Sequence, residues 1–167
     1  MANPDIPNGF VPTPLSRVRP YEVLVGYGTA IYPGDVTDAL TDGSVGVAAA
    51  AATTINGSSM DYSAASTANT IGVADDPQQE FVAQDDASAT PVQADVFENA
   101  DHVATTGDTT LLQSRHEIAI STAVNTTGGF MLTQLIKNPD LSIGVNAVWR
   151  CLCNEHVFHT GKTTTSS

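Results

Sequence analysis

The stretch TIGVADDPQQEFVAQDD, residues 70–86, decides the fold of this chain because it contains two strand patterns separated by a turn that no helix can cross. Pro77 fixes its own φ and moves Asp76 out of the helical region. On each side of this turn the side chains suit a strand, and after it they alternate with a period of two. We predict one strand over 71–74 and a second over 80–85, and we expect the other strands to join this pair in one sheet or barrel.

Length and composition limit the class of protein. A chain of 167 residues can form one domain that buries roughly 70% of its unfolded surface, so it needs no disulfide framework. Asp and Glu outnumber Lys and Arg by 18 to 6, which gives a formal net charge of −12. Such a chain repels phosphate backbones, so we expect no direct binding of nucleic acid.

The sequence shows no membrane or secretion signal. No apolar run approaches the ~18 residues that a membrane-spanning helix needs. The first ten residues, MANPDIPNGF, have neither a basic start nor an apolar core, so we expect no signal peptide and no membrane partner.

The first 20 residues predict an extended arm. Prolines in such density favour a polyproline II conformation and prevent a helix. Phe10, Val11 and Leu15 are apolar and poorly suited to solvent, so we expect the arm to dock on a partner chain. The alternatives are a disordered terminus and an arm that folds back on its own barrel. The prolines concerned are Pro4, Pro7, Pro12, Pro14 and Pro20.

The rest of the chain reads as short strands separated by turns. The run 45–55 could form a helix or a strand. Its five alanines favour a helix, whereas the residues that flank them favour a strand. Asn56-Gly57 is the strongest hairpin signal, so we predict a β-hairpin that turns there. One short helix is expected near 91–95. Further strand patterns lie at 21–27, 115–121, 130–137 and 145–153, and in the segment 29–36 Pro33-Gly34 predicts a tight turn or a break in an edge strand.

These patterns predict an all-β protein with a single barrel-like or sandwich-like domain, an extended N-terminal arm and at most one short helix. We divide the chain into the arm at 1–20, a β-barrel domain at 21–160 and a flexible polar tail at 161–167. The strand at 130–137 is apolar on both faces, so we expect it to be central. The strand at 145–153 places Trp149, Cys151 and Cys153 on one face, which we predict to be the core face.

Cys151, Cys153, His156 and His159 are four possible zinc ligands within nine residues. In a strand, however, the two cysteines point to one face about 6–7 Å apart, whereas zinc knuckles place two residues between their cysteines, usually at a turn. Buried cysteine is also an ordinary small core residue. We therefore predict core cysteines and surface histidines, with no metal and no cofactor; a metal site is the alternative.

Other candidate chemistry is weaker. The acidic pairs Asp75-Asp76 and Asp85-Asp86 are not part of a D-x-D-x-D-G sequence, the pattern of a calcium-binding loop. We therefore interpret them as solvated surface residues. Ser114, His116 and Glu117 lie in a strand without the elbow of a nucleophilic serine. The sequence therefore predicts no enzymatic activity.

Several segments follow one another in an order that suggests a family. They are Asn3-Pro4 with the run PNGFVP at 7–12, TAIYPGDV at 29–36, IGV at 71–73 with DDP and EFVAQDD, NAD at 99–101 with GDTT, and NAV at 146–148 with NEH. Together they resemble the capsid cement, or head decoration, proteins of tailed bacteriophages. The segment 43–66 resembles that family least.

The resemblance implies a β-barrel-like domain that binds the outside of an assembled head, often as a trimer, and no catalysis. We therefore expect a structural virion protein, made in the host cytoplasm, on the outer surface of the mature capsid. It would bridge subunits of the major capsid protein and stabilise the shell against the pressure of packaged DNA. The alternative is a phage tail or host-adhesion β-sandwich module, which predicts exposed aromatic side chains at loop tips.

The arm is the predicted contact element of this protein. Extended arms gain affinity by covering area, at an ordering cost that prolines reduce. We expect Arg17 and Arg19, which are rare cations in an acidic chain, to pair with acidic capsid residues; solvated charge is the alternative. The residues predicted to face the capsid or a neighbour are Pro7, Phe10, Val11, Pro12 and Leu15.

Overall fold

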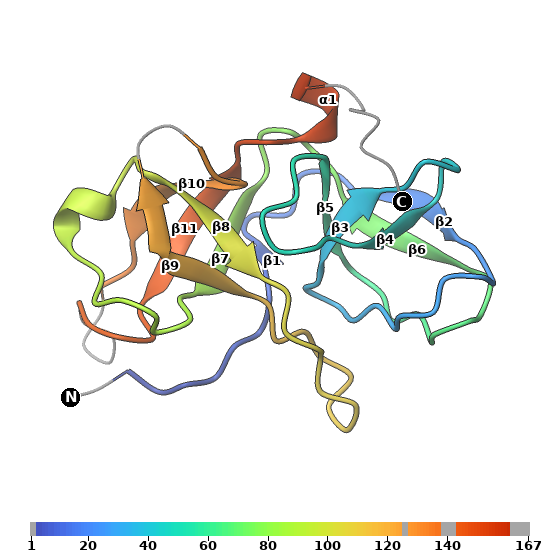
Figure 1. Cartoon of the computed structure of the whole chain (residues 1–167), viewed down its shortest axis with the longest axis horizontal. Helices are drawn as coiled ribbons and strands as arrows, with labels where there is room; N and C mark the ends of the chain where they lie inside the picture. Colours follow the sequence, from blue (N-terminus) through green and yellow to red (C-terminus); the bar gives the residue numbers. More distant parts are fainter. Residues whose placement is uncertain (1–2, 125–126, 138–142, 161–167) are drawn as a thin grey trace.

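The structure is a computed structural model that describes residues 3–124, 127–137 and 143–160. Within them the chain is nearly all β, as predicted, and its strands form two antiparallel sheets that lie side by side (Figure 1). The first sheet has the order β1 (Val11–Pro12), β7 (Glu80–Gln84), β11 (Val148–Cys153), β10 (Phe130–Leu135), β8 (Asn99–Val103) and β9 (Glu117–Val124). The second has the order β2 (Arg19–Val23), β6 (Asn69–Ala74), β5 (Ile55–Ser59), β3 (Val36–Ala39) and β4 (Val45–Val47).

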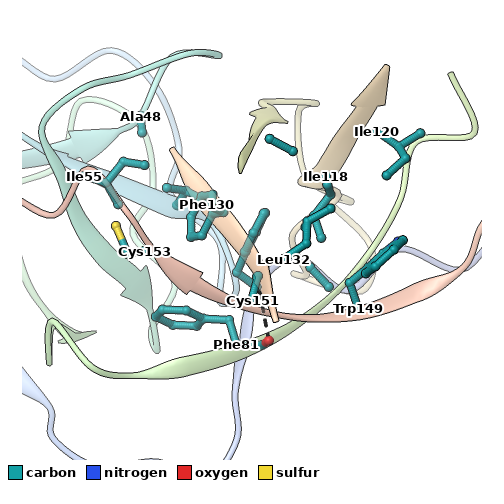
Figure 2. Packing of buried hydrophobic residues seen from close by; sticks show 14 of the residues in the cluster. Ala48, Ile55, Phe81, Ile118, Ile120, Phe130, Leu132, Trp149, Cys151 and Cys153 are labelled. Carbon is teal, nitrogen blue, oxygen red and sulfur yellow. Dashed lines mark hydrogen bonds between the residues drawn. The ribbon is translucent and has the colours of Figure 1, made fainter. Parts of the chain in front are cut away.

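One hydrophobic core joins the two sheets. Phe81, Phe130 and Trp149 of the first sheet pack in the same cluster as Val36 and Ile55 of the second. Figure 2 shows the part of this cluster that surrounds Phe130. A shared core makes the two sheets a single sandwich-like domain rather than two units.

The first sheet also curls towards closure. Asp85, just beyond the end of β7, forms a parallel bridge with Ile118 in β9. The N–H of Asp86 donates to the carbonyl of Ile118 at 3.0 Å, and its carboxylate accepts the N–H of Ile120 at 3.2 Å. These bonds cover part of the free edge of β9, which would otherwise be open to pairing with another chain.

The stretch 70–86 forms two strands and a turn, as predicted, but β6 and β7 are not partners in one sheet. β6 pairs with β2 and β5, whereas β7 pairs with β1 and β11. The expectation that these two strands form a pair within one sheet is therefore wrong. The reason lies in the connection: Asp75 and Gln79 bond to arm residues Arg17 and Ser16, so the arm enters where the two strands diverge.

The hairpin predicted at Asn56-Gly57 is also wrong, because both residues lie inside β5. Thr37 pairs with Gly57 but Asp38 pairs with Ile55, so Asn56 is the extra residue of a β-bulge. Gly57 has φ +144°, and a Cβ there would overlap the carbonyl oxygen of Ala74. Gly57 therefore does not form a hairpin turn. It permits a bulge and a close approach of two backbones, which is another common role of glycine in strands.

The remaining predictions are mostly confirmed. The run 45–55 contains β4 and a turn rather than a helix, and a 3₁₀ turn at Gln93–Asp95 stands where a short helix was expected. β10 lies inside its sheet, and β11 buries Trp149, Cys151 and Cys153. Strand β8 was not predicted, nor was the short helix α1 (Val157–Thr160).

The predicted boundary of the arm at residue 20 falls inside β2, which begins at Arg19. The predicted tail at 161–167 lies outside the described residues. No helix in the described part of the chain is long and apolar enough to cross a membrane.

Candidate functional site

The N-terminal arm runs over the surface of its own domain and is fastened there by hydrogen bonds. The side chain of Asn3 donates to the carbonyl of Val145 at 3.0 Å. Gln84 binds the arm twice, because its Nε2 donates to the carbonyl of Pro4 at 2.6 Å and its Oε1 accepts the N–H of Ile6 at 2.9 Å. The start of the arm is therefore held against the end of β7.

The middle of the arm adds a short edge strand to the first sheet. In β1, Val11 pairs with Val82 and Pro12 with Phe81. Pro12 has no N–H, so the outer edge of β1 lacks one of the donors that another strand would need. The arm thus extends the sheet and limits further edge pairing.

Phe10 is a core residue and not an exposed contact residue. Its side chain is completely buried, stacked on Phe130 at 4.3 Å between ring centroids and edge-on to Phe81 at 6.5 Å and His102 at 6.3 Å. The hydroxyl of Ser58 donates to its carbonyl at 2.7 Å. We therefore correct the expectation that Phe10 faces a partner: this part of the arm folds back on its own domain.

The outer face of the arm carries the apolar side chains that remain candidates for binding. Val11 and Leu15 were predicted and are exposed, whereas Pro7 and Pro12 are half-buried. Ile6 and Val18 are exposed as well and were missed, although their apolar character in a proline-rich segment was a usable signal. We call the four exposed side chains the arm surface: Ile6, Val11, Leu15 and Val18.

Shallow hollows flank the arm. One of about 240 Å³ lies between Val11, Pro12 and Met60. Another of about 110 Å³ lies between Ile6, Val11 and the strand residue Val82. Two of the exposed side chains of the arm, Ile6 and Val11, therefore border concave surface, which suits contact with a partner rather than with solvent.

Arg17 and Arg19 already have a partner in their own chain. Arg17 Nε donates to Asp75 Oδ1 at 2.8 Å, and this bond raises the pKa of Arg17. Arg19 Nη1 lies 3.6 Å from Asp75 Oδ2, which also accepts the hydroxyl of Tyr21 at 2.6 Å. Both guanidinium groups lie over the ring of Phe158, at 5.9 and 5.7 Å from its centroid. The two arginines therefore fasten the end of the arm to Asp75 and to α1. Asp75 and Asp85 are both completely buried, so the interpretation of the acidic pairs as solvated surface is wrong for these two residues.

A buried polar cluster lies beside the residues that pack on the ring of Phe10. The N–H of Val36 donates to His116 Nδ1 at 3.1 Å, so the proton of this ring sits on Nε2, 3.4 Å from Asp35 Oδ1. Burial raises the pKa of Asp35 to about 6 and lowers that of His116 to about 3. His116 stacks on His102 at 5.5 Å, and His102 contacts Phe10. The cluster thus supports the packing that holds the arm.

This cluster contains Ser114 and His116, which were considered above as parts of a catalytic triad, and adds Asp35, which sequence reasoning missed. The Ser114 hydroxyl accepts the backbone N–H of His116 at 3.0 Å rather than contacting the imidazole ring. All three side chains are buried, so a substrate has no access to them. The geometry is that of a structural network.

Cys151 and Cys153 are core residues, as predicted. The Cys151 thiol donates towards the carbonyl of Phe81 at 3.7 Å (Figure 2), and burial raises the pKa of both thiols. His156 is buried too, which corrects its prediction as a surface residue, and its Nδ1 accepts the N–H of Phe158 at 3.1 Å. Among the described residues, no group of three or more His, Cys, Asp or Glu side chains could hold a metal ion.

No protein-family model matches this chain, and no curated protein matches it.

Proposed function

We propose that the protein is a structural component of a phage virion that binds the outer surface of the mature capsid as a homotrimer. In this role it bridges subunits of the major capsid protein and stabilises the shell against the pressure of packaged DNA. The observation that carries the proposal is the arm surface: a line of exposed apolar side chains held in one conformation by its own domain.

An ordered arm binds better than a loose one because less conformational entropy is lost on binding. The arm here is fastened at its start by Gln84, in its middle by Phe10 and at its end by Asp75. The segment from Ile6 to Val18 spans at most roughly 40 Å in an extended chain, which is long enough to cross a boundary between two subunits. A single copy can therefore contact more than one subunit of a shell.

Preferential binding to the finished shell is what stabilises it. A ligand that binds the assembled state and not the free subunits lowers the free energy of that state by RT ln(1 + [L]/Kd) at each site. At a concentration ~100 times Kd this is about 2.7 kcal/mol per site, and a shell offers many sites.

Sedimentation with phage heads tests the proposal. Mature heads prepared without the protein should bind it, and dissociated capsid subunits should not. The double variant Val11→Ser/Leu15→Ser should bind heads more weakly, whereas Val25→Ser, an exposed residue outside the arm, should bind like the wild type. Equal binding to heads and free subunits, or to neither, would refute the proposal.

A second candidate function is a host-adhesion or tail module, and Phe97 is the observation that favours it. Its side chain is 73% exposed at positive φ, 75°, while its N–H donates to the carbonyl of Leu132 at 2.7 Å. Exposed aromatic rings commonly serve recognition. Binding of labelled protein to host cells that is lost in Phe97→Ser and kept in the arm variant would favour this candidate.

A further inference from the structure

The loop between β8 and β9 ends in a rigid hairpin at residues 108–113, which projects from the body of the molecule (Figure 1). Asp108 and Gln113 exchange backbone hydrogen bonds of 2.8 and 3.3 Å. The carboxylate of Asp108 accepts the N–H groups of Thr110 and Leu111 at 2.8 and 2.9 Å, which lowers its pKa. The tip is thus held by its own hydrogen bonds.

The base of this hairpin is anchored in the domain. A Cβ at Gly107 would overlap the ring of Tyr32, so backbone and ring are in close contact there. Ser114 donates its N–H to the carbonyl of Pro33 at 3.1 Å, and Tyr32 packs against Tyr62 at 5.3 Å between centroids. The position of the tip relative to the domain is therefore set by packing at its base.

The rigid tip presents apolar side chains to solvent. Leu111 is 70% exposed, and Leu112 is 44% exposed at φ +51°, a conformation that is strained for a residue with a side chain. Ile6 of the arm, 64% exposed, lines the same hollow of about 200 Å³ as Leu111. Strain and apolar exposure at one tip are costs to the free protein, which suggests that both serve a bound state.

We propose that Ile6, Leu111 and Leu112 form a second contact surface, the hairpin surface, which enters an apolar pocket with a Lys- or Arg-rich rim on a partner protein. The inference rests on the proposed function, in which the partner is the assembled capsid shell. It adds to that function an element outside the arm.

Charge selects this partner over the other possible ones. Asp5 and Asp108 line the hollow together with Arg115, and the whole chain carries a formal charge of −12. A second copy that met this surface with the same surface would bring the carboxylates of Asp5 and Asp108 together, and an anionic lipid surface would repel them as well. A pocket with a basic rim attracts it instead.

Continuity with the arm surface supports a single partner for both. Gln113 lines the hollow beside Leu111 and also the hollow beside Val11 and Pro12. The two surfaces are therefore adjacent, and one shell can cover them at once. Because the hairpin is already rigid, its leucines lose little freedom when they bind.

The test measures the affinity of labelled protein for mature heads that lack it. Leu111→Ser should weaken binding at least about tenfold, which corresponds to about 1.4 kcal/mol. The exposed Val25, far from this surface in sequence, gives the matched control, and Val25→Ser should change affinity less than about twofold. Leu112→Gly should weaken binding without loss of thermal stability, because glycine relieves the positive φ while removing the side chain.

The outcomes separate this inference from the proposed function. If the wild type binds heads and Leu111→Ser binds equally well, only the hairpin surface is refuted. If the wild type does not bind heads, both proposals fall. Loss of self-association in Leu111→Ser by sedimentation equilibrium, or loss of its binding to phosphatidylglycerol vesicles, with head binding unchanged, would assign the surface to a second copy or to a membrane and overturn the inference.

Discussion

The ring of Phe10 stacks on the ring of Phe130 at 4.3 Å between centroids, so the N-terminal arm contributes a side chain to the centre of the core. Phe130 belongs to β10, an internal strand of the first sheet. The arm is therefore part of the folded domain at Phe10, while its neighbour Val11 faces outward. A buried side chain and an exposed one therefore follow each other where the arm enters β1.

Substitutions at Phe10 and Val11 distinguish the buried position from the exposed one. Phe10→Ala should lower the free energy of unfolding by about 3–5 kcal/mol, because it leaves a cavity among Phe81, His102 and Phe130. Val11→Ala, at the exposed neighbouring position, should change it by less than about 0.5 kcal/mol. Urea denaturation followed by tryptophan fluorescence measures both, since Trp149 lies in the same core. Equal stability of the two variants would contradict the assignment of Phe10 to the core.

Gly57 should tolerate no side chain. Gly57→Ala places a Cβ on the carbonyl oxygen of Ala74 at a φ of +144°, so we expect a loss of about 2 kcal/mol or more. Gly26 provides the control, because a Cβ there meets no atom within 4 Å. Thermal unfolding of both variants checks the prediction, and a Gly57→Ala protein as stable as Gly26→Ala would rule out the bulge in β5.

The pH dependence of stability should report the pair Asp35 and His116. The pKa of His116 is lowered to about 3, so the stability it contributes is present above its unfolded value near 6.5 and is lost as the pH falls. The pKa of Asp35 is raised to about 6, so its contribution is present below its unfolded value near 3.9 and is lost as the pH rises through 6. Between pH 4 and 6 the two contributions have opposite slopes.

Single substitutions separate these slopes. Asp35→Asn removes the group that adds stability as the pH falls. The free energy of unfolding of this variant should therefore decrease more steeply than that of the wild type between pH 6 and pH 4. His116→Asn should lose less than the wild type over the same interval. Urea unfolding at several pH values gives the slopes, and parallel curves for all three proteins would show that neither group titrates differently in the folded state.

The ion pair of Arg17 should matter more than a surface pair. Arg17→Gln leaves the fully buried carboxylate of Asp75 with fewer donors, so we expect a lower melting temperature. Arg150→Gln breaks the pair with Glu80, at 3.4 Å and partly exposed on both sides, and should have little effect. Calorimetry on the two variants makes the comparison; an equal effect of both would mean that Asp75 does not depend on Arg17.

Sequence patterns predicted those parts of the fold that depend on neighbours along the chain. Alternation in 145–153 placed Trp149, Cys151 and Cys153 on one buried face, and Pro77 placed a turn between two strands. Asn56-Gly57 misled because the same glycine suits a hairpin turn and a bulge, and only the carbonyl of Ala74 beside it distinguishes the two. β8 was missed because its alternating pattern contains the polar residues Asn99, Asp101 and His102, of which only His102 is buried.

The candidate site was predicted in outline. The proline-rich arm and its exposed Val11 and Leu15 follow from composition, but the burial of Phe10 and the pairing of Arg17 with Asp75 do not. Likewise, nothing in the order of residues joins Ile6 to Leu111, which line the same hollow only in the folded chain.

The sequence by itself determined the β class of this protein, its proline-rich arm, its acidic net charge and the core face of its last strand, because each depends on the type and spacing of nearby residues. Only the tertiary structure decided that β6 and β7 enter different sheets, that Phe10 fills the core and that Asp35 meets His116. These relations join residues far apart in the chain, and their free energy comes from packing and hydrogen bonds that exist only after the sheets have formed.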